Sequence, residues 1–439
     1  MSYNIGLSGL YAANKALNVT GHNIANVATT GFKASRAEFA DQYAASIKAT
    51  SGKTNVGSGV MTAAVSQQFT QGNITSTGQS LDMAINGNGF FVLSDNGSKV
   101  YSRAGAFYSD KSGNIVDVSG NNLQGYNAVN GTLQTGVLTN LKIDTSNIQP
   151  KATSQINQTS NLDSSAAAPS VSPFDPANVK SYNYTFNTSL YDSQGNEHQL
   201  NQYFVKDGTN NSWKMYTTVD GRNPLDPVNS ATPLENEIPF KEDGSLNTAA
   251  MTAGSGATQL TVNANKTFTL EGWKPASKLA DGSFVLNGAA PNGTGVSLDM
   301  SATTQYNAAS ATTKKDQDGY STGELAGLSV DSSGVLFANF NNGEDKIIGQ
   351  VAMANFANVQ GLGPIGGTNW KQTFASGDAI IGTPSTGIMG SLTAESLEDS
   401  NVDLTSELVN LIKAQSNYQA NAKTISTEST IMQTIIQMA

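Results

Sequence analysis

The stretch GHNIANVATTGFK, residues 21–33, follows an apolar-periodic segment and carries one full charge, on Lys33. A solvated surface normally shows charged side chains, and a buried core normally shows larger apolar ones. Asn, Thr and Gly are weak helix formers, so a helix of this composition is marginal alone in water. The stretch therefore predicts a segment that needs a partner surface.

A seven-residue spacing of apolar side chains predicts a helix at each end of the chain. The N-terminal spacing runs through Tyr3, Leu10, Leu17 and Ile24, with Ala13 and Val27 on the adjoining track. One C-terminal track contains Leu404, Leu411, Tyr418, Ile425 and Met432, and its companion track contains Leu408, Gln415, Ala422, Ser429 and Ile436. We predict that these helices pair as a coiled coil, and that Asp403 is the N-cap of the second.

Both predicted helices are poor in charge. Lys15 is the only full charge between Ser2 and Ala28, and residues 404–439 contain only Glu407, Lys413, Lys423 and Glu428. Uncharged polar side chains can bond to a neighbour without the desolvation cost of a charge. Burying one Leu or Ile contributes roughly 1.5–3 kcal/mol, which offsets the ordering entropy only when a partner surface exists. Our hypothesis is that both ends fold on assembly, and the alternative is two low-charge surface helices.

The long middle of the chain has the pattern of β-structure. Asp95-Asn96-Gly97 and Lys111-Ser112-Gly113-Asn114 are turn signals, as are Ser332-Ser333-Gly334 and Asn341-Asn342-Gly343. Between these blocks, apolar residues alternate with polar ones through Phe186, Thr188 and Leu190, and again through Trp213, Met215, Thr217 and Val219.

These patterns predict a mainly β chain with α-helical termini. A β domain built from two separated segments would hold a second β domain inserted into it. We expect an N-terminal helix at 1–32, a connector at 33–71, a first β domain at 72–150 plus 301–365, an inserted β domain at 151–300, a connector at 366–400 and a C-terminal helix at 401–439.

Composition argues against several classes of function. The net charge is −10 and charged residues are 13% of the 439, so we expect neither nucleic acid nor an anionic membrane as a partner. The chain has no Cys, which excludes disulfides and thiolate sites. Its N-terminus lacks the basic and apolar segments of a signal peptide, so we expect export, if any, without a cleaved signal.

No residues stand out as catalytic. His22 and His198 are the only histidines and lie in different predicted domains, so a Ser-His-Asp site at either is an unfavoured alternative. Residues 361–366 match G-x-G-x-x-G, but Pro364 argues for a loop rather than the helix that a dinucleotide site requires. Residues 110–114 and 192–196 resemble calcium-loop fragments without the acidic twelfth position, and we interpret them as turns. We predict no enzyme activity, no metal and no cofactor.

Three separated segments resemble the bacterial flagellar rod and hook axial proteins. The first is NIANVATTGFK at 23–33, and the second runs from LDMAINGNGFF at 81–91 through YSRAG at 101–105 to Gly125-Tyr126. The third combines SNVDL at 400–404 with AQSNYQANAK at 414–423, where Ser416 replaces a basic residue of many relatives. The large segment before Asn355-Phe356-Ala357-Asn358 and Asn369-Trp370 is most similar to the hook members of this family.

The resemblance implies a structural subunit that polymerises into a curved, flexible tube, a universal joint between rod and filament that encloses the export channel. The implied partners are other copies of the chain, the distal rod subunit, the hook cap protein, the hook–filament junction protein and the flagellar type III export apparatus. The implied location is the hook, outside the cell. A distal rod or other axial subunit is one alternative, and a secreted β-rich adhesin or enzyme is another.

The predicted assembly residues follow from the terminal segments. Gly31 would end the first helix with a left-handed cap, Phe32 would anchor the exit, and the tract from Asn26 to Thr30 would pack against adjacent subunits. The N-terminal set is Leu10, Leu17, Ile24, Asn26, Gly31, Phe32 and Lys33. The C-terminal set is Leu404, Leu408, Leu411, Tyr418, Ile425, Met432 and Ile436.

Overall fold

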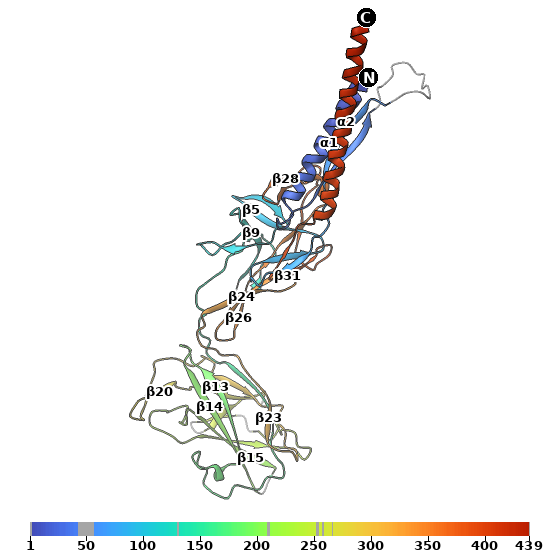
Figure 1. Cartoon of the computed structure of the whole chain (residues 1–439). Coiled ribbons are helices and arrows are strands. Elements are labelled where there is room, and N and C mark those ends of the chain that lie inside the picture. The colour runs from blue at the N-terminus through green and yellow to red at the C-terminus, as the bar shows by residue number, and fades with distance from the viewer. Residues whose placement is uncertain are drawn as a thin grey trace. The chain divides into compact units, whose positions relative to one another are not determined.

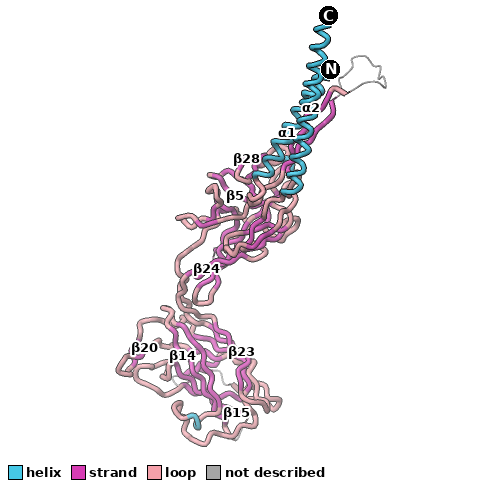
Figure 2. Tube along the Cα trace, viewed as in Figure 1, coloured by secondary structure: helices cyan, strands magenta, loops and turns pink. Residues whose placement is uncertain are grey.

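The computed structural model describes residues 2–42, 57–129, 131–208, 211–251, 254–256, 259–265 and 267–438. The chain divides into two compact units. The first unit comprises residues 1–145, 326–339 and 345–439, and the second comprises 146–325 and 340–344. Figure 2 shows that long helices occur at the two ends of the chain and that strands and loops make up most of the rest. The predicted mainly β fold with helical termini is confirmed.

The two long helices lie side by side in the first unit (Figure 1). They are α1 (Ser2–Ala25) and α2 (Leu404–Met438). Asp403 caps α2 as predicted, because its Oδ1 accepts a hydrogen bond of 2.8 Å from the Ser406 N–H. A hairpin of β1 (Ser35–Gln42) and β2 (Gly59–Gln67) follows α1 and packs on it. Within the described residues, no helix has the length and apolarity needed to cross a membrane.

The first unit is built on one large, mostly antiparallel sheet. Its hydrogen-bonded order is β24 (Leu325–Val330), β25 (Val335–Phe340), β26 (Asp345–Val351), β9 (Asn122–Val129), β5 (Phe90–Asp95), β6 (Ser98–Ser102), β29 (Asn369–Lys371) and β28 (Gly363–Gly366). Shorter strands attach beside it, namely β7 (Tyr108–Ser109), β8 (Ile115–Val116), β10 (Thr132–Leu133), β11 (Thr139–Asn140), β27 (Met353–Asn355) and β30 (Ile380–Gly382). Two further pairs join β3 (Ile74–Ser76) to β32 (Ser396–Glu398) and β4 (Met83–Asn86) to β31 (Ser391–Ala394). A 3-10 turn, η2 (Val359–Gly361), precedes β28.

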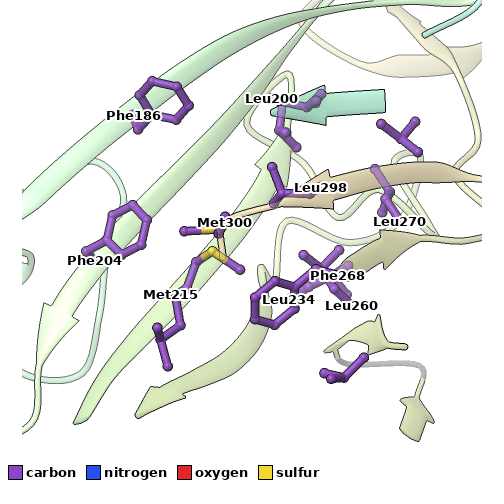
Figure 3. Packing of buried hydrophobic residues seen from close by; sticks show 14 of the residues in the cluster. Phe186, Leu200, Phe204, Met215, Leu234, Leu260, Phe268, Leu270, Leu298 and Met300 are labelled. Carbon is purple, nitrogen blue, oxygen red and sulfur yellow. The ribbon is translucent and has the colours of Figure 1, made fainter. Parts of the chain in front are cut away.

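The second unit holds two sheets that share one apolar core (Figure 3). The first sheet has the order β13 (Tyr184–Tyr191), β14 (Glu197–Lys206), β15 (Ser212–Val219) and β16 (Leu234–Pro239). The second has the order β17 (Gly254–Gly256), β18 (Gln259–Val262), β19 (Phe268–Leu270), β22 (Val296–Asp299), β12 (Gln155–Asn161) and β23 (Ala311–Gln317). A separate pair joins β20 (Ala276–Lys278) to β21 (Phe284–Leu286), and η1 spans Val179–Ser181.

The alternation predicted for the second unit is confirmed. Phe186 and Leu190 of β13 and Met215 of β15 are buried in the core that Figure 3 shows, together with Leu298 and Met300 from the facing sheet. The side chains between them point to the other face of the sheet, where Thr185 and Asn187 are exposed. A period of two therefore identified the buried face correctly.

The predicted turns are also formed. Asn96 and Gly97 have φ angles of 47° and 92° between β5 and β6, the left-handed pair of a two-residue hairpin. The Asp192 carboxylate accepts hydrogen bonds from the backbone N–H groups of Gln194 and Asn196, so the calcium-like fragment at 192–196 is a turn. In the G-x-G-x-x-G segment the strand β28 follows η2, and no helix opens there.

Several segment boundaries differ from those expected. The N-terminal helix ends at Ala25 rather than near residue 32, because the Asn26 side chain bonds the His22 carbonyl at 2.8 Å and the chain turns. The expected connector 33–71 contains the β1–β2 hairpin, and the expected connector 366–400 contributes β29 to β32. Residues 301–325 lie in the second unit rather than the first, since β23 pairs with β12. The C-terminal helix begins at Leu404.

Candidate assembly surfaces

The pairing of α1 with α2 depends on small residues. The fully buried positions of α1 include Gly6, Ala13 and Thr20, which recur every seven residues. A Cβ on Gly6 would lie 3.1 Å from Ile425 Cγ1, and a Cβ on Gly9 would overlap the Asn421 side chain. The helices approach closely because these positions lack bulk.

The structure places the large predicted residues of α1 beside this contact. Leu10, Leu17 and Ile24 are half-buried, whereas Tyr3 and Tyr11 are exposed. The bulky apolar residues of α1 therefore retain accessible surface after α1 and α2 have paired. Their role in contacts between copies stays a prediction.

On α2 the predicted residues divide into two groups. Leu411, Tyr418 and Ile425 are half-buried against the rest of the first unit. The exposed members are Leu404, Leu408, Met432 and Ile436. Of the predicted companion track, Ala422 is half-buried, but Gln415 and Ser429 are exposed, and the track one position earlier is more buried because it contains the buried Ala414 and the half-buried Asn421. The small Ala414 fits the close approach to α1 better than a larger side chain.

The last three turns of α2 have no covering element in the part of the chain that the structure describes. Gly6 of α1 lies opposite Ile425, so α2 continues past the start of α1 (Figure 1). Every described residue of 429–438 is exposed, and among them are the apolar side chains Ile431, Met432, Ile435, Ile436 and Met438. A charge-poor helix end with apolar side chains around it is typical of a surface that a partner covers.

The tract after α1 forms a compact turn. The Thr29 hydroxyl donates to Asn26 Oδ1 at 3.1 Å, and the Phe32 N–H donates to the Thr29 carbonyl at 3.2 Å. Phe32 is buried with its ring 5.4 Å from that of His22, and its role as the anchor of the exit stays a prediction. Gly31 has a φ of 69° but lies six residues beyond the end of α1, so it does not cap that helix.

Lys33 belongs to a buried ion cluster that sequence reasoning missed. Its Nζ lies 2.6 Å from Glu398 Oε1, and Arg103 Nη1 lies 3.1 Å from Glu398 Oε2. The Gly72 N–H donates to Glu398 Oε1 at 2.9 Å, and Lys33 also donates to the Thr70 carbonyl. Two cations and one carboxylate are thus removed from water together, which is tolerable only when all of them are bonded.

The ion cluster joins two of the three resembling segments through Lys33 and Arg103, and Asn401 of the third segment bonds beside it. Burial lowers the pKa of Lys33 and Arg103 more strongly than the Glu398 carboxylate raises it. Beside the cluster, Asn401 Oδ1 accepts a hydrogen bond of 2.7 Å from the Ala34 N–H, and its Nδ2 donates to the Gln68 carbonyl. The sequence offered one sign of these contacts, because Lys33, Arg103 and Asn401 each lie in one of the three motifs. Glu398 lies outside the motifs, so the motifs did not point to it as the partner of the two cations.

A groove lies beside the tract that follows α1. It has a volume of about 830 Å³ and also takes in Lys15 and His22. We call it the motif groove, and its main apolar lining is Val19, Phe32, Val65, Ala104, Val118 and Trp370. Its size and lining are in the range of sites that bind another molecule or chain segment.

His198 in the second unit is held between two carboxylates. Its Nδ1 lies 2.7 Å from Asp220 Oδ2 and its Nε2 lies 3.3 Å from Asp192 Oδ2, with the Trp273 ring edge-on at 5.2 Å. Both ring nitrogens are therefore engaged by carboxylates, which leaves no acceptor for a serine hydroxyl. Burial by itself lowers the pKa of His198, but the hydrogen bonds and charges of Asp220 and Asp192 outweigh it and raise the pKa.

The second unit is therefore expected to lose stability as the pH rises. Because the pKa of His198 is higher in the folded than in the unfolded chain, protonated His198 stabilises the fold. This stabilisation is fully present below the unfolded pKa of about 6.5 and is lost as the pH rises through the folded pKa. The free energy of unfolding is measured in denaturant at several pH values between about 5 and 9. The ¹⁹F NMR signals of 5-fluorotryptophan at Trp273 and Trp370 follow the unfolding of the second and the first unit, respectively. His198→Gln should flatten the pH dependence of the second unit, and an unchanged slope would contradict this assignment.

Comparison with known proteins accounts for the whole chain. Matches to family models cover residues 4–33 (flagella basal body rod protein), 84–160 (flagellar hook protein FlgE/F/G D1 domain), 161–320 (flagellar basal body protein FlaE D2 domain) and 393–438 (flagellar basal body rod FlgEFG protein C-terminal). The flagellar hook protein FlgE of Escherichia coli K12 is 40% identical, with 100% of both chains covered. The chain belongs to the flagellar hook protein family.

Two other hook proteins extend this result. FlgE of Salmonella typhimurium is 37% identical over 100% of both chains, and FlgE of Treponema pallidum is 33% identical over 99% of this chain and 98% of the relative. The crystal structure of Helicobacter pylori FlgE2 covers 74% of this chain and 100% of its own, with 14% identity and a TM-score of 0.50, and it supports the fold. The resemblance drawn from the three motifs is confirmed, and the family is a structural one.

Proposed function

We propose that the chain is the structural subunit of the bacterial flagellar hook and polymerises through its terminal helices and the tract 26–33. The observation that carries the proposal is the pairing of α1 with α2 through small residues, which leaves charge-poor apolar surface exposed on both. Tyr11 of α1 and Ile436 of α2 are examples of that surface. A polymer of such subunits would cover it with neighbouring copies.

The proposed polymer is a curved, flexible tube that acts as a universal joint between rod and filament and encloses the export channel. In it α1 and α2 form an inner coiled coil, the sheets of the first unit form the first β domain, and the second unit is a β domain inserted into it. The outward face of β13, with exposed Thr185 and Asn187, favours polar, wet contacts between inserted domains. Such hydrogen bonds exchange with water at little net cost when the tube bends.

The proposed partners are further copies of the chain and, at the ends of the tube, the distal rod subunit, the hook cap protein and the hook–filament junction protein. Export through the flagellar type III apparatus would leave α1 in place. The packing of α1 supports this, because Ala13 and Asn23 are buried and Asn23 bonds Ser35 at 2.8 Å in both directions. Cleavage that removed α1 would expose the faces of α2 and of the β1–β2 hairpin that α1 covers.

Substituting both Met432 and Ile436 by Gln tests the proposal. Both side chains are exposed in the monomer, so its folding should not change, and Gln is a good helix former. If neighbouring copies bury them, the loss is about 3–6 kcal/mol per subunit contact. The critical concentration for polymerisation should then rise by at least about 100-fold, measured by sedimentation and electron microscopy of the purified full-length chain.

Val179→Gln is the matched control. Val179 is 72% exposed, like Ile436 at 71%, but it lies in the second unit. Its substitution should leave the critical concentration within about twofold, since exposed positions outside a contact have small effects. Unimpaired polymerisation by the α2 variant would refute the proposed role of this helix end.

A further inference from the structure

One large apolar side chain of the described residues, that of Phe374, is entirely exposed to solvent. Phe374 has a relative exposure of 105%, above every other large apolar side chain for which exposure is resolved. An aromatic ring contributes most when it is buried, so a fully exposed one at a fixed position is typical of a contact residue.

The turn that carries Phe374, residues 372–378, is firmly braced. Ser376 Oγ donates to the Thr373 carbonyl at 2.8 Å, and the Thr373 hydroxyl donates to the Gly361 carbonyl. Asn358 Nδ2 donates to the Ala375 carbonyl at 3.0 Å, and a Cβ on Gly361 would overlap the backbone of Ala375. The backbone that carries Phe374 is therefore held in place, and its side chain extends away from the protein.

The motif groove and the Phe374 turn lie at opposite ends of one hairpin. The turn between β28 and β29, which contains Gly367 and Thr368, lines the groove. Phe374 follows β29 at the other end, where Gly363 pairs with Lys371. Complementary features at opposite ends of a rigid element cannot meet within one copy, whereas a head-to-tail contact between copies can bring them together.

The charges of the motif groove and of the Phe374 turn are also complementary. Lys15, the only fully charged residue of α1, lines the groove, and Asp378 is the only acidic residue of the Phe374 turn. Both side chains are exposed. We propose that the motif groove of one copy receives the Phe374 turn of a second copy, with Phe374 against the apolar lining and Asp378 near Lys15. This inference rests on the proposed function and names one contact within the polymer.

A photo-crosslinking experiment tests the contact directly. Phe374→p-benzoylphenylalanine keeps an aromatic ring at this position, and mixed polymers of ¹⁵N-labelled and unlabelled chains distinguish links between copies from links within one. Mass spectrometry should find links from residue 374 to 15–33, 102–119 or 364–370 of another copy. The same probe at Val137, which is 71% exposed and outside the groove lining, should not label these segments. Links to other regions, the exposed end of α2 included, would overturn the inference.

Substitutions supply the second test. Phe374→Ala should raise the critical concentration at least about tenfold, and Val137→Ala less than about twofold. Lys15→Glu and Asp378→Lys should each raise it up to about fivefold and together restore it, because every copy then carries the exchanged pair. An unchanged critical concentration for Phe374→Ala would refute the groove contact. The hook proposal would still stand in that case, because the variant would polymerise normally. If the unmodified chain forms no polymer, both fail.

Discussion

Glu398→Gln is expected to lower the free energy of unfolding of the first unit by about 3–5 kcal/mol. Glu398 is completely buried, and its carboxylate is an ion-pair partner of both Lys33 and Arg103. The amide has nearly the same shape but no charge, so two cations would remain buried without a counter-ion. The ¹⁹F signal of 5-fluorotryptophan at Trp370, the only Trp of the first unit, reports this transition in denaturant.

Asp399→Asn is the control for the loss of an acidic side chain at the next position. Asp399 is exposed and accepts one hydrogen bond, from the Thr75 hydroxyl at 2.6 Å. Its substitution should cost less than about 1 kcal/mol. Similar small losses for both variants would show that the ion cluster contributes little to the stability of the first unit.

Gly31→Ala is expected to destabilise the first unit by about 2–5 kcal/mol, through two effects that add. The residue has a φ of 69°, a region that costs an L-residue about 1–2 kcal/mol. A Cβ there would also lie 2.5 Å from the Ala104 nitrogen and 2.7 Å from the Arg103 carbonyl carbon. These are backbone atoms, so the overlap needs a shift that costs about 1–3 kcal/mol more. Denaturant unfolding followed at Trp370 measures the sum.

Gly78→Ala separates the two effects. Gly78 has nearly the same φ, 71°, but a Cβ there would meet nothing within 4 Å. Only the backbone strain remains, so the loss should be about 1–2 kcal/mol. Equal losses at the two glycines would mean that the contact of Gly31 with the backbone at residues 103–104 is not tight.

Local patterns were sufficient for much of the fold. The alternation through Phe186, Thr188 and Leu190 identified the buried face of β13, and Asn96-Gly97 identified a hairpin, because both signals depend on a few neighbouring residues. The heptad spacing identified both terminal helices and the half-buried Leu411, Tyr418 and Ile425. The spacing did not identify which second track of α2 is buried. That choice depends on where the small residues of α1, such as Gly6 and Gly9, let α2 approach.

The amino-acid sequence was sufficient to predict the type of most elements, the family through its three motifs, and the scarcity of charge at the two ends of the chain. The contacts that those motifs make within one chain depend on the tertiary structure. Lys33 and Glu398 are 365 positions apart, and the need to neutralise buried charges brings them together with Arg103. The same holds for the motif groove, whose walls come from segments far apart in sequence that only packing places side by side. Local propensity acts over a few residues, whereas burial and charge pairing act through space.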